Sequence, residues 1–153
     1  MSLERIEAAY QRRGTADPRY HPLRPEQMHA LQERERVLAA LLRRHGRTDT
    51  AALRAAELGC GAGGNLLMLL QLGFRPEHLC GAELMPERLA LARERLPAGV
   101  QLHGGDACMA PIAPASQDLV LAFTVFSSVP GDDLQQRLAD TAWRWLRPGG
   151  ALI

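Results

Sequence analysis

Between positions 55 and 65 the chain passes from a short apolar run into a glycine-rich loop and then into a second apolar run. Glycines stand at positions 59, 61, 63 and 64, and the second apolar run covers residues 66–70. Glycine readily adopts a positive φ and lets a ligand approach main-chain N–H groups, and the first turn of a helix offers further unpaired donors. The stretch therefore predicts a strand, a tight loop and a helix, with a polar ligand at the loop.

The glycine spacing alone does not identify that ligand. Gly59, Gly61 and Gly64 satisfy the G-x-G-x-x-G pattern of dinucleotide-binding loops, which also suits other nucleotide-like ligands. Glu57, two residues before the first glycine, favours a ligand with a positively charged ammonium group and is a poor neighbour for a pyrophosphate. A nicotinamide-dependent oxidoreductase is therefore an alternative that Glu57 disfavours.

Five short motifs in chain order resemble those of class I S-adenosylmethionine-dependent methyltransferases. The first has the form E-x-G-x-G-x-G, and together the five cover about residues 50 to 153. The resemblance implies S-adenosyl-L-methionine as the cofactor and methyl transfer as the activity. The motifs are Glu57 with Gly59, Gly61 and Gly63; Glu83 at the end of the next strand; Gly105-Asp106-Ala107; Gln117-Asp118-Leu119-Val120; and Leu146-Arg147-Pro148-Gly149-Gly150.

The resemblance also implies the roles of single residues. Glu57 interacts with the methionyl end of the cofactor, and Gly59 and Gly61 pack beneath it. Asp106 meets the adenine amino group and the Ala107 backbone lies beside the ring; a turn-forming aspartate is the alternative.

Glu83 follows Gly59 by 24 positions. This is close to the offset of roughly 20 residues at which a carboxylate accepts hydrogen bonds from ribose hydroxyls. A capping role for the following helix is the alternative. Leu84 and Met85 pack against the adenine or ribose, or belong to the core, while Phe123 ends the fourth strand on the ligand side.

Strands and helices alternate along the chain. Strands are expected at 53–58, 79–84, 100–103, 118–123 and from 151, with helices of 10 to 15 residues or shorter between them. This alternation predicts an α/β fold with a doubly wound, mostly parallel Rossmann-like sheet and a ligand beyond the carboxyl ends of its strands. The resemblance implies the strand order 3-2-1-4-5, without the last strands of the family's sheet.

Residues 1–46 form an N-terminal helical or lid segment, and 47–153 form the cofactor-binding domain. Within the segment, a short helix over residues 2–13 and an irregular stretch precede a helix that begins at Pro25 and ends before Gly46. By resemblance such elements partly cover the cofactor; covering one sheet edge is the alternative. Possible ligand contacts are Tyr10, Arg19 and Tyr20.

Composition excludes several classes of partner. The net charge is +1, and the 18 basic residues are scattered arginines, so neither nucleic acid nor a membrane is expected as a partner. Three cysteines lie far apart and the histidines lack ligand spacing, which predicts no disulfide framework and no metal site. The N-terminus is charged from its fourth residue, unlike a signal peptide, so the cytoplasm is expected.

The acceptor is expected to be a small molecule. Residues 123–130 lack the Asn/Asp-Pro-Pro-aromatic signature of relatives that methylate nucleobases or glutamine side chains, and offer hydroxyls and aromatic surface instead. We assign no catalytic residue, because methyl transfer from a sulfonium mainly needs alignment. Cys60 in the glycine loop suggests a nucleophile, but a small buried hydrophobe is favoured. A non-catalytic cofactor-binding fragment that self-associates through an exposed sheet edge is a further alternative.

Overall fold

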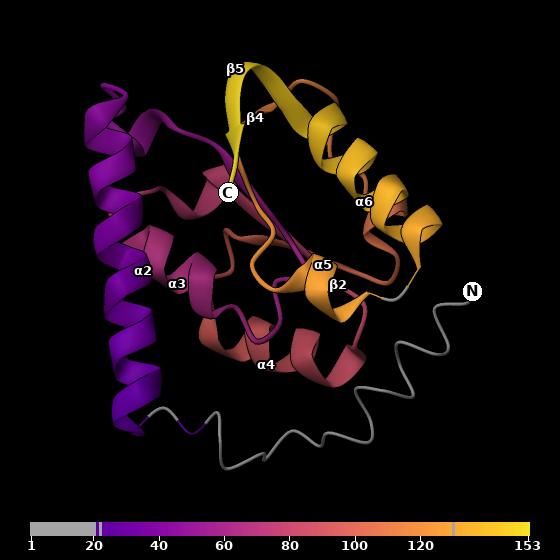
Figure 1. The fold of residues 1–153 in the computed structure, drawn as a ribbon, viewed down its shortest axis with the longest axis horizontal. Helices are drawn as coiled ribbons and strands as arrows, with labels where there is room; N and C mark the ends of the chain where they lie inside the picture. Colours follow the sequence, from indigo (N-terminus) through magenta and orange to yellow (C-terminus); the bar gives the residue numbers. More distant parts are fainter. Residues whose placement is uncertain (1–20, 22, 130) are drawn as a thin grey trace.

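The computed structural model describes residues 21, 23–129 and 131–153. A parallel sheet of five strands lies between two layers of helices (Figure 1). The order β3-β2-β1-β4-β5 confirms the predicted doubly wound arrangement. The strands are β1 (Ala55–Leu58), β2 (Leu79–Glu83), β3 (Gln101–Gly104), β4 (Gln117–Leu121) and β5 (Leu146–Leu152).

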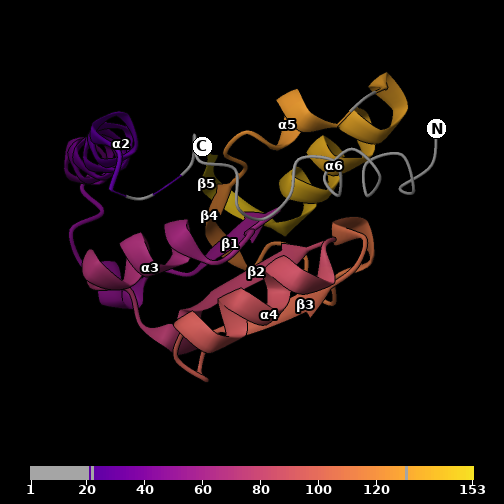
Figure 2. The same ribbon diagram turned by 90° about the horizontal axis from the view of Figure 1, so that it is seen from below.

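The helices follow the start signals in the sequence. Pro25 and Pro86 occupy the first turns of two of them, where proline's missing N–H costs no hydrogen bond. Figure 2 shows α2, α3 and α4 on one side of the sheet and α5 and α6 on the other. The helices are α2 (Pro25–Arg44), α3 (Gly64–Gln71), α4 (Pro86–Arg95), α5 (Val125–Ser128) and α6 (Asp132–Trp145), with single 3-10 turns at η2 (Thr50–Ala52), η3 (Pro76–His78) and η4 (Ala107–Met109).

Alternate residues of the central strands supply the two cores. Leu119 and Leu121 join the cluster formed with α2, α3 and α4, whereas Val120 between them joins the cluster under α6. Trp145, the last residue of α6, is fully buried in the second cluster. Both faces of β4 are therefore covered, which explains its continuous apolar sequence.

The structure differs from the sequence-based expectations at β5 and α5, and other expectations concern residues or a boundary that it does not test. The fifth strand begins at Leu146 rather than at 151, because β5 pairs with Gln117 first and then bulges before Ala151 pairs with Leu119. The short helix α5 was not expected. Tyr10, Arg19, Tyr20 and the helix expected over 2–13 lie outside the described residues, and the boundary at residue 46 stays a prediction.

The amino end of β4 is anchored by Asp118, which belongs to the fourth of the five sequence motifs. Its Oδ2 accepts a hydrogen bond from the Arg54 main-chain N–H at 2.8 Å, and its Oδ1 lies 3.4 Å from Arg47 and 3.3 Å from Arg147. The Asp118 side chain is only 7% exposed. These contacts join β1, β4, β5 and the segment after α2 at the end of the sheet opposite to the carboxyl ends.

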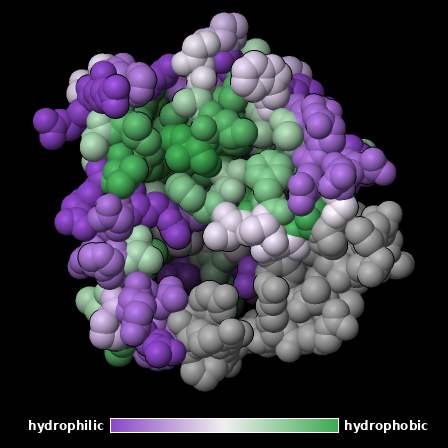
Figure 3. Space-filling model, in the orientation of Figure 1, coloured by the Kyte–Doolittle hydropathy of each residue, from purple (hydrophilic) through white to green (hydrophobic). Residues whose placement is uncertain are grey.

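A hydrophobic surface lies between α2 and the end of β5 (Figure 3). Leu41, Leu152 and Ile153 line grooves there, and β5 is an edge strand of the described sheet.

Within the described residues, no helix combines the length and apolar character needed to cross a bilayer.

Candidate functional site

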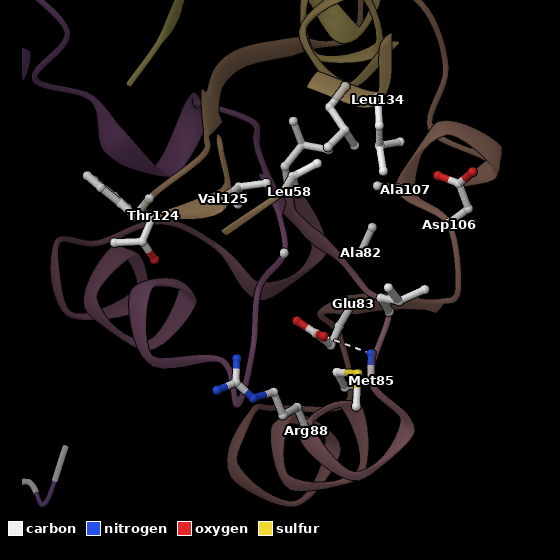
Figure 4. A pocket seen from close by; sticks show the side chains of 15 residues that line it. Leu58, Ala82, Glu83, Met85, Arg88, Asp106, Ala107, Thr124, Val125 and Leu134 are labelled. Atoms are coloured by element: carbon white, nitrogen blue, oxygen red, sulfur yellow. Dashed lines mark hydrogen bonds between the residues drawn. The ribbon is translucent and has the colours of Figure 1, made fainter. Parts of the chain in front are cut away.

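A cleft opens at the carboxyl ends of β1, β2 and β4, where the two halves of the sheet diverge. In Figure 4 Glu83 lies in the middle of this cleft, with Asp106 on one side and Thr124 on the other. Open α/β sheets bind ligands at this position, outside the strands at the switch in connection direction. The lining residues are Leu58, Gly59, Ala82, Glu83, Leu84, Met85, Arg88, Asp106, Ala107, Phe123, Thr124, Val125, Val129, Leu134 and Leu138.

The glycines of the loop have three different functions. Gly59 has φ +64°, and a Cβ there would lie 2.9 Å from the Val125 side chain. Gly61 presents its N–H to Glu83. Gly63 has φ +82° at the N-cap of α3, and a Cβ there would lie 2.7 Å from Leu96, so its role is packing against the residue after α4 rather than lining the cleft.

Two main-chain donors hold the Glu83 carboxylate at the end of β2. The Gly61 N–H donates to Oε2 and the Met85 N–H donates to Oε1, both at 2.8 Å (Figure 4 shows the second). A carboxylate offers about four acceptor positions, so both oxygens can accept further hydrogen bonds. The contact with Met85, the N-cap of α4, supplies the capping role. The ribose role stays a prediction that this geometry permits.

Glu57 lies behind the glycine loop and is 1% exposed. Its Oε1 accepts a hydrogen bond from the Asn65 side-chain amide, whereas Oε2 is buried and has no hydrogen-bond partner among the residues that the structure describes. Burial raises the pKa of this carboxyl to about 8, with a smaller upward contribution from Glu83, while Asn65 and Arg34 lower it. A buried acceptor oxygen without a donor suits a ligand that carries N–H groups.

The raised pKa of Glu57 predicts a dependence of stability on pH. In the ligand-free protein Glu57 stays protonated up to about pH 8, whereas in the unfolded chain it ionises near its usual value of 4.5. Stability from this group is therefore complete below pH 4.5 and is lost as the pH rises toward 8, by up to about 1.4 kcal/mol per pH unit. Urea unfolding at pH 5, 6, 7 and 8 should show this slope in the wild type. Glu57→Gln should flatten it, and equal slopes in the two proteins would contradict the prediction.

Asp106 follows β3 and begins η4. Its Oδ1 accepts from the Cys108 main-chain N–H at 2.9 Å, which is the turn-forming contact, and its Oδ2 accepts from Arg137 of α6 at 3.1 Å. Asp106 and Ala107 both line the cleft. One oxygen of Asp106 therefore shapes the turn and the other pairs with an exposed arginine. The adenine role stays a prediction.

The segment after β4 forms the wall opposite Asp106. Phe123 and Thr124 line the cleft, and Thr124 has φ +60°, an uncommon conformation for a β-branched residue. The hydroxyls of Ser127 and Ser128 donate to the Thr124 carbonyl at 3.0 and 2.9 Å. Of the hydroxyls expected to serve the pocket, these two therefore stabilise α5 instead.

The residues predicted to bind the cofactor divide into those that line the cleft and those that do not. Residues predicted to bind cofactor that line the cleft are Gly59, Glu83, Leu84, Asp106, Ala107 and Phe123, whereas Glu57, Gly61 and Gly63 do not line it. Sequence reasoning missed Arg34, Asn65 and Val125. Only Asn65 carried a signal, since it lies in the first turn of the helix after the loop.

Two of the three cysteines, Cys60 and Cys80, are in surroundings that suppress reactivity. Cys60 and Cys80 are buried, and burial raises the pKa of both thiols, that of Cys80 to about 12. Since the thiolate is the reactive form, neither is a nucleophile at neutral pH. This geometry favours the interpretation of Cys60 as a small buried hydrophobe.

The fold and the cleft together define a Rossmann-like domain of the S-adenosylmethionine-dependent methyltransferase class. The family model for the methyltransferase domain matches residues 56–153, and the chain belongs to this family. The cofactor of this class, S-adenosyl-L-methionine, is the group the cleft has to hold. The acceptor capacity of Glu83 and the apolar lining of the cleft fit its ribose and adenine parts. The Glu57 carboxyl, which is buried behind the glycine loop and does not line the cleft, is an acidic group that fits its ammonium.

Two curated relatives are similar to part of the chain. The tRNA N(3)-methylcytidine methyltransferase Mettl2 of Drosophila melanogaster is 30% identical over 69% of this chain and 35% of its own length. The arsenite methyltransferase of Halobacterium salinarum is 31% identical over 61% of this chain and 24% of its own length. The chain thus spans about a third or less of the length of these relatives.

Solved structures share the fold. The amino pentose methyltransferase CalS10 from Micromonospora echinaspora, solved with S-adenosylmethionine bound, is 29% identical. It aligns with a TM-score of 0.66 over 99% of this chain and 56% of its own. The PH0226 protein of Pyrococcus horikoshii has the same TM-score at 20% identity over 94% of this chain and 63% of its own, which supports the fold alone.

Proposed function

We propose that the chain transfers a methyl group from S-adenosylmethionine to a small organic acceptor. The observation that carries this proposal is a second hollow of about 440 Å³ beside the cleft, with Phe123 in the wall of both. Its size falls in the range of roughly 300–1,000 Å³ typical of small-molecule sites. Its mostly apolar lining consists of Glu26, His29, Ala30, Glu33, Arg34, Val37, Leu38, Leu41, Phe123 and Ile153.

In this proposal, residues at the carboxyl ends of the strands would hold the cofactor. Glu83 accepts hydrogen bonds from the ribose hydroxyls, and Asp106 with Ala107 receives the adenine. Leu84 and Met85 contact its apolar surface, and Glu57 binds the ammonium of the methionyl end. If these residues hold the cofactor in this way, Phe123 would lie between it and the second hollow, because Phe123 lines both.

The residues of the chain orient the reactants and provide no acid or base to the reacting atoms. The bound sulfonium supplies an activated methyl group and a neutral thioether leaving group. Phe123 lies in the wall of both hollows and sets the direction in which the acceptor approaches the methyl group. The apolar lining limits the access of water to the acceptor hollow. An acceptor nitrogen or oxygen that attacks with its lone pair releases its proton to solvent.

Two other acceptor classes fit the residues less well. Trivalent arsenic is a soft ligand that binds thiolates, but Cys60 and Cys80 are buried with raised pKa values, and none of the three cysteines lines the cleft. Transfer RNA binders need a basic surface, and the net charge of the chain is only +1. The amino pentose methyltransferase, which is 29% identical, is similar to 99% of this chain.

A bulky substitution in the second hollow should separate acceptor binding from cofactor binding. Val37 is 49% exposed on the hollow-facing part of α2, so Val37→Trp should fill the hollow without disturbing the core. We expect methyl transfer to fall at least tenfold with S-adenosylmethionine affinity unchanged. The assay measures radiolabelled methyl transfer to a panel of amino sugars, phenols, arsenite and transfer RNA.

The matched control is Leu91→Trp, a 41% exposed position on α4 outside both hollows. It should leave methyl transfer unchanged. Transfer to RNA or arsenite, with no small organic molecule methylated, would reject the proposed acceptor class.

Two partner and location proposals accompany this function. The edge of β5 favours self-association, which sedimentation at micromolar concentration measures. We further propose a cytoplasmic location, with neither nucleic acid nor a membrane as partner, from the net charge of +1.

A further inference from the structure

A chain of side chains connects helix α2 to the buried carboxylate behind the glycine loop. The Arg34 Nη1 donates a hydrogen bond to the Asn65 Oδ1 at 2.7 Å, and the Asn65 amide in turn donates to the Glu57 Oε1. Arg34 lies 31 residues before Asn65 in the sequence, so only the tertiary fold brings α2 and α3 together here.

The guanidinium of Arg34 is fixed by a second contact. Its central carbon lies 4.7 Å from the centroid of the Phe123 ring, within cation–π range. Phe123 follows β4, so Arg34 joins α2 to the end of β4 as well as to α3. An arginine held by both a ring and an amide has less freedom to leave Asn65 than a solvated surface arginine has.

We propose that Arg34 is a positioning residue for the cofactor: acting through Asn65, it holds the Glu57 carboxylate in place for the ammonium group of S-adenosylmethionine. The inference rests on the proposed placement of the methionyl end at Glu57. It assigns to α2 a function beyond covering the sheet.

The electrostatics around Glu57 support this role. The groups that act on it are Arg34 from α2 and Asn65 from α3, which favour its ionised form, and Glu83 from β2, which disfavours it along with burial. An ammonium ligand pairs with the ionised carboxylate, so binding must remove a proton from Glu57 over much of the neutral pH range. Because Arg34 lowers the pKa of Glu57, its loss should make that deprotonation harder.

The test measures S-adenosylmethionine affinity by calorimetry between pH 6 and pH 9 for Arg34→Met. We expect at least tenfold weaker binding at pH 7 and a shift of the pH profile toward higher pH, because more base is needed to ionise Glu57. Arg34→Lys keeps the charge but not the planar fork, and should restore part of the affinity. Arg44→Met, an exposed arginine at the end of the same helix, should match the wild type.

A double-mutant cycle shows whether the effect passes through Glu57. Glu57→Gln removes the titrating group, so Arg34→Met should change affinity less than threefold in that background. Asn65→Ala interrupts the connection without altering α2, and should reproduce the pH shift even if Arg34→Met fails to fold.

Wild-type affinity and pH profile in Arg34→Met would overturn the inference, as would an equal effect in the Glu57→Gln background. These outcomes leave the acceptor proposal intact, since no acceptor is present. Failure of the wild type to bind the cofactor would instead reject the proposed function.

Discussion

Glu83→Gln should weaken S-adenosylmethionine binding by about a hundredfold, which corresponds to about 2.7 kcal/mol. Glutamine has one acceptor oxygen, whereas both Glu83 oxygens already accept main-chain hydrogen bonds from Gly61 and Met85. The new amide NH2 would face one of those N–H groups, donor against donor. Hydrogen bonds to a charged group contribute about 1.5–3 kcal/mol each, so the loss of one of these, along with those to the ribose, accounts for the expected change.

Calorimetry with S-adenosylmethionine and S-adenosylhomocysteine measures this effect, and both ligands should weaken equally because they share the ribose. Glu87→Gln is the matched control, since Glu87 is an exposed glutamate in the first turn of α4. It should bind both ligands as the wild type does. Unchanged affinity in Glu83→Gln would remove Glu83 from the cofactor site.

Asp118→Asn should lower the free energy of unfolding by about 2–3 kcal/mol. The substitution keeps the volume and one acceptor but leaves Arg47 and Arg147 without the carboxylate between them. Breaking a fully buried pair costs about 3–5 kcal/mol; the expected cost is lower because the Arg47 and Arg147 side chains are 27% and 40% exposed.

Urea unfolding at pH 7 measures this loss. Asp140→Asn, an exposed aspartate on α6, should stay within about 0.5 kcal/mol of the wild type. Cofactor affinity measured well below the unfolding temperature should not change in Asp118→Asn, because Asp118 lies at the amino end of β4, away from the cleft. A large loss of affinity without a loss of stability would show that the structural role is wrong.

Local sequence signals predicted the strands and most of the helices, whereas the strand order came from the family resemblance. Strand β2 is preceded by the turn that begins at Pro76 and is followed by Pro86. Helix α6 begins at Asp132 and Asp133 and has apolar residues at helical spacing. Alternation of such elements permits few arrangements, because parallel strands require right-handed crossovers. The bulge in β5 escaped prediction, since it depends on how Gly150 packs against the Asp118 carbonyl of the neighbouring strand.

The site was predicted less completely than the fold. A carboxylate at the end of a strand, such as Glu83 or Asp106, can be located from the order of elements alone. The partners of that carboxylate cannot be located in this way. Gly61 lies 22 residues from Glu83, and Arg137 lies 31 residues from Asp106. Hydrogen bonds over such separations depend on how two loops approach each other.

The sequence by itself determined the glycine loop, the alternation of strands and helices, and the acidic residues at the strand ends, because each follows from neighbours along the chain. Only the tertiary structure decided which groups surround Glu57. Its burial, its unpaired Oε2 and its connection through Asn65 to Arg34 arise where α2, α3 and β1 pack together. The protonation of a buried carboxyl depends on the charges and donors that packing brings to it, and no local pattern in the sequence records them.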